Sequence, residues 1–118
     1  MKFIIFFVST ILTQTLCLGQ KLNKGSYTFT YCDLEYNMCI GTCKIIIKGD
    51  SIAVYATKEL SEKLTHVKEG DIIEKGIIVK HKSGKWILGA SPKDKNINKI
   101  GIDGPAILDF KKKQYWTF

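Results

Sequence analysis

The feature that most constrains the fold of this chain is a series of short β-strand patterns separated by tight turns. In residues 26–31 aromatic side chains alternate with serine and threonine, and this period of two predicts a strand with one buried face. Gly49 and Asp50 separate two runs rich in β-branched residues, 44–48 and 51–57. A two-residue connection of this kind predicts a tight hairpin.

More strand patterns follow at residues 72–73, 77–79, 85–88, 106–110 and 115–118. We expect Gly76 to mark a bulge or bend between two of them, and residues 91–104 to form a loop. About seven to eight short strands predict an all-β fold, either a small antiparallel meander barrel or a sandwich. We favour the barrel because short turns join consecutive strands.

One segment interrupts the β pattern. The apolar residues that fall there at the i, i+4 and i+7 spacing of a helix face are Leu60, Leu64 and Val67. We therefore expect one short helix near residues 58–67, with Thr57 or Ser61 as its N-cap.

The N-terminus has the layout of a secretory signal peptide. Lys2 precedes an apolar run at residues 3–8, and small residues stand just before Gln20. We expect residues 1–19 to be removed. A single β-rich domain, residues 20–118, would then be exported to the periplasm or the cell exterior.

Two observations bear on membrane attachment. Lipidation of Cys17 is an alternative to simple cleavage, but Leu16 is bulky where lipidation motifs carry a small residue. The apolar run near the N-terminus is shorter than the roughly 20 residues that a membrane-spanning helix needs. No other segment approaches that length, so we expect no membrane-spanning segment.

The charge of the chain comes from lysine. Eighteen basic residues stand against 11 acidic ones, giving a net charge of +7, and none of the basic residues is arginine. Arginine is the residue that reads phosphates and base edges in bidentate fashion, so its absence argues against a nucleic-acid partner. An excess of lysine by itself indicates solubility and non-specific attraction to anions.

Three cysteines remain after the signal peptide, namely Cys32, Cys39 and Cys43. Exported proteins retain disulfides. Cys39 and Cys43 would be about 13 Å apart in an extended strand, beyond the limit of about 7 Å between the Cα atoms of a disulfide. Cys32 ends one predicted strand and Cys43 begins the next, so the two could face each other across a hairpin. We therefore expect a Cys32–Cys43 disulfide, which leaves Cys39 as a free thiol or as a site of intermolecular bridging.

Metal binding and catalysis are weaker alternatives. A Cys₃His zinc site would need His66 or His81, but the cysteine spacing is not a standard zinc pattern. A catalytic triad would combine His81 with Asp103. Its nucleophile would be Ser83 or Ser91, but no nucleophile motif surrounds either serine. We therefore expect no catalytic residue, no metal and no cofactor.

Two predicted turns carry lysines next to aromatic residues. Their candidate binding residues are His81, Lys82, Lys85, Trp86, Lys111, Lys112 and Lys113. Such turns suit an anionic partner, which would be an acidic protein, a glycan or a lipid. The alternative without a binding function is that lysines at strand ends only prevent strands from pairing with other chains.

The loop after the first predicted strand is a second candidate surface. Asp33, Glu35 and Tyr36 place an aromatic side chain among acidic ones, next to the expected disulfide. Rigid loops on a β scaffold are common recognition sites.

Three functions are compatible with these observations. The favoured one is a small exported, non-enzymatic domain that binds another protein, as an inhibitor or immunity-type protein does. The second is a barrel that binds a small ligand or an anionic lipid or glycan, although about 100 residues leave little room for a cavity beside a core. A hydrolase or metal-dependent enzyme is the least favoured.

Overall fold

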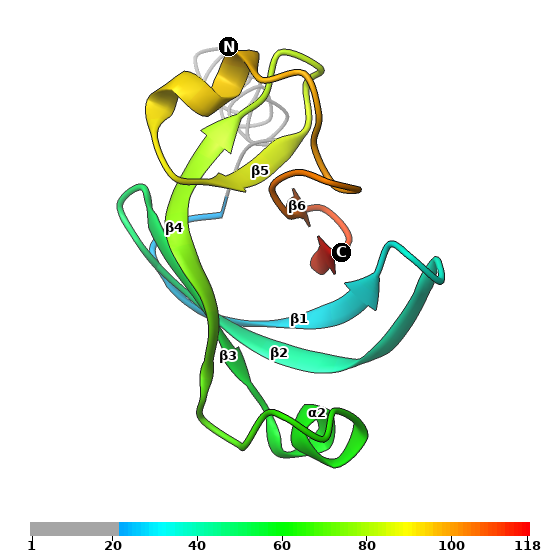
Figure 1. Cartoon of the computed structure of the whole chain (residues 1–118). Coiled ribbons are helices and arrows are strands. Elements are labelled where there is room, and N and C mark those ends of the chain that lie inside the picture. The colour runs from blue at the N-terminus through cyan, green and yellow to red at the C-terminus, as the bar shows by residue number, and fades with distance from the viewer. Residues whose placement is uncertain (1–21) are drawn as a thin grey trace, which may run out of the picture.

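The strands of this protein form one closed sheet in the computed structural model, which describes residues 22–118 (Figure 1). In chain order they are β1 (Gly25–Asp33), β2 (Met38–Lys48), β3 (Ser51–Ala56), β4 (Ile72–Lys80), β5 (Trp86–Gly89), β6 (Ile107–Asp109) and β7 (Gln114–Thr117). A short helix, α2 (Lys58–Lys63), lies between β3 and β4, and a 3₁₀ turn, η1 (Pro92–Asn96), follows β5. The predicted small all-β barrel with one short helix is confirmed within these residues.

The parallel direction of the closing strand pair follows from the odd number of strands in the meander. Each strand runs antiparallel to the next along the chain, so the first and the last run in the same direction. Residues 30–33 of β1 therefore pair in parallel with residues 114–117 of β7. The meander is antiparallel as predicted except at this closing pair.

The barrel interior is filled by alternate side chains of the strands. The buried residues that β2 and β3 contribute are Cys43, Ile45, Ile47, Ile52, Val54 and Ala56. They meet Phe29, Leu108 and Tyr115 in one core cluster. The β2–β3 hairpin turns at Gly49 and Asp50 as predicted, and Gly49 has a φ of 61°, which glycine adopts without steric cost.

The helix α2 packs against β2 and β3 at one end of the barrel (Figure 1). Its predicted N-cap is confirmed: the Thr57 hydroxyl accepts a hydrogen bond from the Leu60 N–H at 3.2 Å and donates one to the Thr42 carbonyl at 2.7 Å. Leu60 is fully buried in the core cluster.

A smaller packing layer lies outside β4 and β5. Val79 and Ile87 face each other in the β4–β5 ladder and are both buried, although neither belongs to the interior cluster. The turn η1 packs against β4. A backbone hydrogen bond of 2.9 Å from the Lys82 N–H to the Lys95 carbonyl fixes it there.

The expected irregularity in β4 occurs at a different residue. The β3–β4 register shifts between Val54 and Tyr55, which leaves Ile73 as the extra residue on β4. Gly76 instead allows a close approach of β5, because a Cβ at this position would collide with the Gly89 carbonyl.

The predicted signal peptide, residues 1–19, and the alternative lipidation site Cys17 lie outside the described residues. From residue 22 to residue 118, no helix has the length and apolar character needed to cross a membrane.

Candidate binding groove

The turn between β1 and β2 is short and cross-linked. It consists of residues 34–37, and Asn37 has a φ of 51°, a left-handed conformation that asparagine tolerates. The β1–β2 ladder begins directly at this turn, so Cys32 lies opposite Cys39. These two cysteines form a disulfide.

This pairing corrects the predicted Cys32–Cys43 disulfide and the predicted free thiol of Cys39. Because the turn is tight, Cys43 lies further along β2, opposite Phe29 and inside the barrel. Cys43 is the free cysteine, and burial raises its pKa to about 12, so the thiol stays protonated at neutral pH.

The disulfide also bears on two other expectations. It occupies two of the three thiols that the alternative Cys₃His zinc site would require. It is consistent with an oxidising, exported location.

The three predicted residues of the β1–β2 turn have different roles. The Asp33 Oδ1 accepts hydrogen bonds from the N–H groups of Glu35 at 2.7 Å and Tyr36 at 3.4 Å, so Asp33 stabilises the turn. Glu35 is exposed. Tyr36 is 69% exposed and the neighbouring Met38 is 52% exposed. The turn and the first residue of β2 therefore present two large apolar side chains to solvent beside the disulfide.

The β4–β5 turn contains a buried histidine. The Nε2 of His81 donates to the Ile97 carbonyl at 2.7 Å, while its Nδ1 accepts from the Ser83 N–H at 3.1 Å. The Ser83 hydroxyl lies 2.8 Å from the same Nδ1. His81 is only 5% exposed. It therefore fixes the segment 91–104 against this turn, and its Nε2 faces a backbone carbonyl instead of the Asp103 carboxylate.

The remaining predicted residues of this turn are more accessible. Lys82 is exposed, with its Nζ 3.5 Å from the Asn98 Oδ1, and Lys85 is also exposed. Trp86 is half-buried and meets Phe110 edge to face, with 6.0 Å between ring centroids. Trp86 thus provides an aromatic surface at the end of the barrel wall.

The β6–β7 turn carries three exposed lysines. The Asp109 Oδ1 accepts a hydrogen bond from the Lys112 N–H at 2.9 Å, which stabilises the turn. Lys113 has a φ of 54°, and its Nζ lies 5.9 Å from the centre of the Tyr27 ring.

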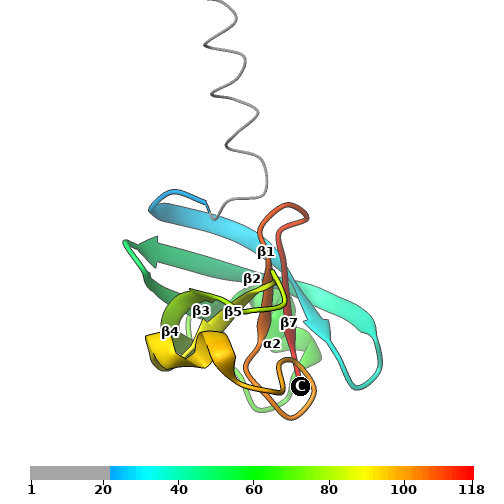
Figure 2. The same ribbon diagram turned by 90° about the horizontal axis from the view of Figure 1, so that it is seen from above.

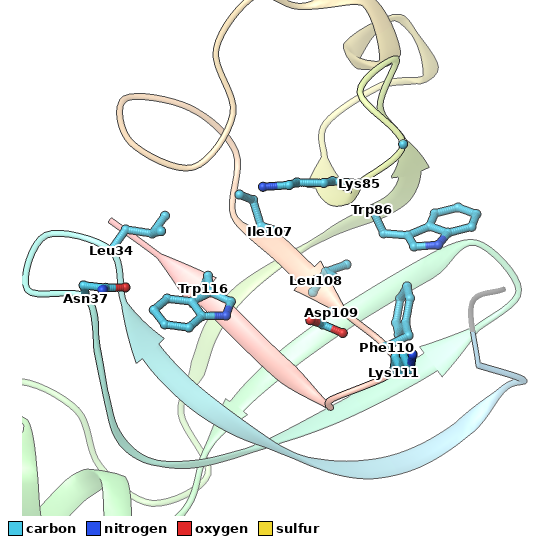
Figure 3. A pocket seen from close by; sticks show the side chains of 11 residues that line it. Leu34, Asn37, Lys85, Trp86, Ile107, Leu108, Asp109, Phe110, Lys111 and Trp116 are labelled. Atoms are coloured by element: carbon cyan, nitrogen blue, oxygen red, sulfur yellow. The ribbon is translucent and has the colours of Figure 1, made fainter. Parts of the chain in front are cut away.

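These three turns meet at a groove of about 350 Å³ that follows β6, which we call the β6 groove (Figure 3). Leu34, Ile107 and Trp116 form its apolar wall near the β1–β2 turn. Trp86 and Phe110 form the other end, as Figure 3 shows. The charged side chains that line it are Lys85, Asp109 and Lys111.

Barrel closure explains why these residues meet. Trp116 lies opposite Ile107 on β6 and opposite Cys32 on β1. The N–H of Leu34 donates to the Thr117 carbonyl at 2.8 Å, which attaches the β1–β2 turn to the end of β7. The parallel β1–β7 pairing therefore places the cross-linked turn beside the Trp116 indole.

A partly buried polar pair lies behind the groove. Tyr115 alternates with Trp116 and points into the barrel, where its hydroxyl donates a hydrogen bond to the Glu74 carboxylate. Burial first, and this carboxylate second, raise the pKa of Tyr115. The pair connects β4 with β7 across the interior and supports the groove wall from within.

Sequence analysis identified part of this site. The predicted residues that line the β6 groove are Lys85, Trp86 and Lys111. Those in the turn at its end are Asp33, Glu35 and Tyr36, and those outside its lining are His81, Lys82, Lys112 and Lys113. Leu34, Ile107 and Trp116 line the groove but were not among the predicted binding residues. The alternation of Tyr115 and Trp116 was the available signal, since only one of two neighbouring strand residues can face the core.

A scan of family models and searches of curated proteins and of solved structures find no match to this chain. Its function is therefore inferred from the groove and the surfaces around it.

Proposed function

We propose that this protein is an exported, non-enzymatic β-barrel that binds another protein through the β6 groove and the adjoining turn 34–37. The observation that carries the proposal is the joint exposure of Tyr36, on the disulfide-linked turn, and Met38, which directly follows it, beside an apolar groove. Grouped large apolar side chains on a surface mark interaction sites. Tyrosine and methionine are both enriched in protein interfaces.

The charges of the groove indicate the chemistry of the partner. Lys85 and Lys111 line the groove with one acidic residue, Asp109, between them in sequence. The Asp109 carboxylate already accepts the Lys112 N–H. A partner segment with acidic side chains around an apolar anchor would complement this surface.

The groove is also preorganised for binding. The disulfide, the Asp33 hydrogen bonds and the buried His81 fix the turns around it. Binding to fixed loops loses less conformational entropy than binding to mobile ones. A rigid surface of this kind suits an inhibitor or immunity-type protein.

The structure offers less support for the other functions. Buried side chains fill the barrel interior, which disfavours a carrier that encloses its ligand. Trp86 and Trp116 would also suit stacking against a sugar, so an acidic glycan is the second candidate. His81 and Ser83 are engaged in holding a turn, and the absence of enzymatic activity stays a prediction.

Selection from a random peptide library tests the proposal. A displayed library of peptides of about 12 residues would be selected against the mature protein. We expect enriched peptides to combine acidic residues with an aromatic or aliphatic anchor, and their affinity to fall by about tenfold or more for Trp116→Ala.

The matched control separates the groove from general charge effects. Lys85→Glu combined with Lys111→Glu should abolish most of the peptide binding. Lys58→Glu combined with Lys68→Glu makes the same change of net charge at exposed positions in or just after α2, and should leave it largely intact. Equal losses in the two double variants would contradict the proposal. So would binding of an acidic polysaccharide, but not of peptides, in the groove.

A further inference from the structure

The strand β1 has one backbone edge that is open over half of its length. Its other edge pairs with β2 from Gly25 to Asp33. On the β7 side, the pairing covers only residues 30–33. Figure 2 shows the β6–β7 hairpin crossing β1 near its middle, with the first half of the strand extending beyond it. Residues 25–29 therefore have no strand partner on that side among the described residues.

The direction of the backbone groups identifies which residues present this edge. The Thr30 N–H donates to the Lys113 carbonyl at 2.8 Å, so it points toward the hairpin. Backbone N–H and C=O groups of alternate strand residues point the same way. The N–H and C=O groups of Ser26 and Thr28 therefore face the open edge, and both residues are exposed.

The barrel core is sealed at this edge although the backbone is not paired. The β6–β7 hairpin turns back at residues 110–113. Phe110 meets Phe29 edge to face with 6.0 Å between ring centroids, and both rings are buried. The open edge is thus a surface feature of a closed core.

Lysines lie on three segments around the first half of β1, two beside the open edge and one on the neighbouring strand β2. Lys24 precedes the strand, Lys44 lies opposite Thr28 in the β1–β2 register, and Lys113 lies over the Tyr27 ring. All three lysines are exposed. Neither residues 22–29 nor residues 110–113 include an acidic residue. The edge therefore combines unpaired backbone groups with positive charge.

We propose that the open edge of β1 binds an extended acidic segment of a partner protein, which adds to the sheet as a further strand. The backbone groups of Ser26 and Thr28 would pair with the added strand, and the three lysines would contact its acidic side chains. A second copy of this chain is a poorer occupant because each copy has a net charge of +7. This surface is separate from the β6 groove and does not depend on it.

Amide hydrogen exchange tests the added strand directly. In the free protein, the amides of Ser26 and Thr28 should exchange quickly while those of Tyr27 and Phe29, which point toward β2, are protected. The probe is a synthetic peptide of about eight residues that alternates glutamate with valine. Its addition should protect Ser26 and Thr28. A lysine–valine peptide should have no effect.

Two sets of variants complete the test. Lys24→Glu with Lys44→Glu should lower the affinity for the glutamate–valine peptide by about tenfold or more. Lys58→Glu with Lys68→Glu should change that affinity by less than about twofold. Thr28→Pro removes an edge N–H and should abolish protection at Ser26, whereas Thr28→Ala should retain it. Circular dichroism would check that the Thr28→Pro and Thr28→Ala variants fold. If Thr28→Pro does not fold, the lysine variants still test the proposal.

Two outcomes would overturn the proposal. One is the absence of protection at Ser26 and Thr28 at saturating peptide. The other is equal weakening in the two double lysine variants. Failure of groove binding would be seen separately, because Trp116→Ala, which alters the groove without changing the charge, should leave the edge protection unchanged.

Discussion

The barrel has two ends that differ in construction. At the α2 end, Leu60 is fully buried. The Thr57 hydroxyl there accepts a hydrogen bond from the Leu60 N–H and donates one to the Thr42 carbonyl. Around the β6 groove, strands of only three or four residues are held by side chains, such as Phe110 against Trp86. The first end resembles any well-packed core. The second exposes aromatic and basic side chains on a fixed frame, which suits contact with a partner.

The difference also concerns how each region is stabilised. The strands β1 to β4 have 6 to 11 residues and pair along long ladders, whereas β5 to β7 have 3 to 4 residues. Short strands form few ladder hydrogen bonds, so the groove depends on the disulfide and on His81. Substitutions at the α2 end should therefore affect stability alone, and those near the groove should affect binding as well.

The largest effect is expected for Leu60→Ala. The side chain is fully buried and its removal leaves a cavity at the α2 end, so the free energy of unfolding should fall by about 3 to 5 kcal/mol. Urea denaturation followed by circular dichroism measures this loss. Folded Leu60→Ala protein should still bind groove-selected peptides with unchanged affinity. A weakened affinity would show that the two ends are coupled and would break the comparison.

Loss of the disulfide should have the next largest effect. The bond closes a loop with a sequence separation of 7, for which chain entropy predicts a stabilisation of about 2 to 3 kcal/mol. Urea denaturation of the double variant Cys32→Ala with Cys39→Ala measures it. Because the same bond fixes the turn 34–37, peptide binding should weaken too. Unchanged affinity would mean that the turn is rigid without its cross-link.

The outcome at the cysteines shows where sequence reasoning reached its limit. The strand runs, the Gly49–Asp50 hairpin and the Thr57 cap are local patterns, and each was predicted. The disulfide depends on the length of one turn. Residues 34–37 carry no glycine or proline that would have indicated a tight turn, so the next strand was expected to begin near Cys43, and Cys43 instead of Cys39 was paired with Cys32.

The groove was predictable only in part for a related reason. Lys85, Trp86 and Lys111 were identified because lysines beside aromatic residues are visible in the sequence. Leu34 and Trp116 are more than 80 residues apart in the chain, and only the parallel β1–β7 closure brings them together. That closure requires the number of strands to be odd, which an estimate of seven or eight left open.

His81→Ala should cost about 1 to 3 kcal/mol of stability, because it leaves the Ile97 carbonyl and the Ser83 N–H without their partner. The loss should be local. Amides in residues 95–104 should exchange faster than expected from the loss of global stability alone. Amides of β1 to β3 should exchange only as fast as global unfolding allows. Uniform acceleration over the whole barrel would show that the segment 91–104 is not an independent layer.

Alkaline pH should destabilise the α2 end through Cys43. Its folded pKa of about 12 is above the ordinary value of 9.0, so the thiol is protonated in both states below pH 9 and its stabilising contribution is complete there. Above pH 9 the unfolded chain ionises first, and stability should fall by about 1.4 kcal/mol per pH unit toward pH 12. Urea denaturation at pH 8 and pH 10 measures this slope.

The Cys43→Ala variant is the control for that slope. The free energy of unfolding should fall by about 1.4 kcal/mol less between pH 8 and pH 10 in this variant than in the original protein. A residual slope should remain above pH 10, because burial also raises the pKa values of Tyr31 and Tyr115. An identical slope in the variant and the original protein would show that the Cys43 thiol is accessible to water.

The smallest effect on stability is expected for Lys85→Glu combined with Lys111→Glu. Both side chains are exposed, so the free energy of unfolding should change by less than about 0.5 kcal/mol, while binding of acidic peptides is largely lost. Leu60→Ala should show the opposite pattern, a large loss of stability with binding retained. A loss of both properties in the lysine variant would mean that the groove lysines stabilise the short strands. The β6 groove would then be part of the barrel's own packing, and the lysines would no longer argue for a partner.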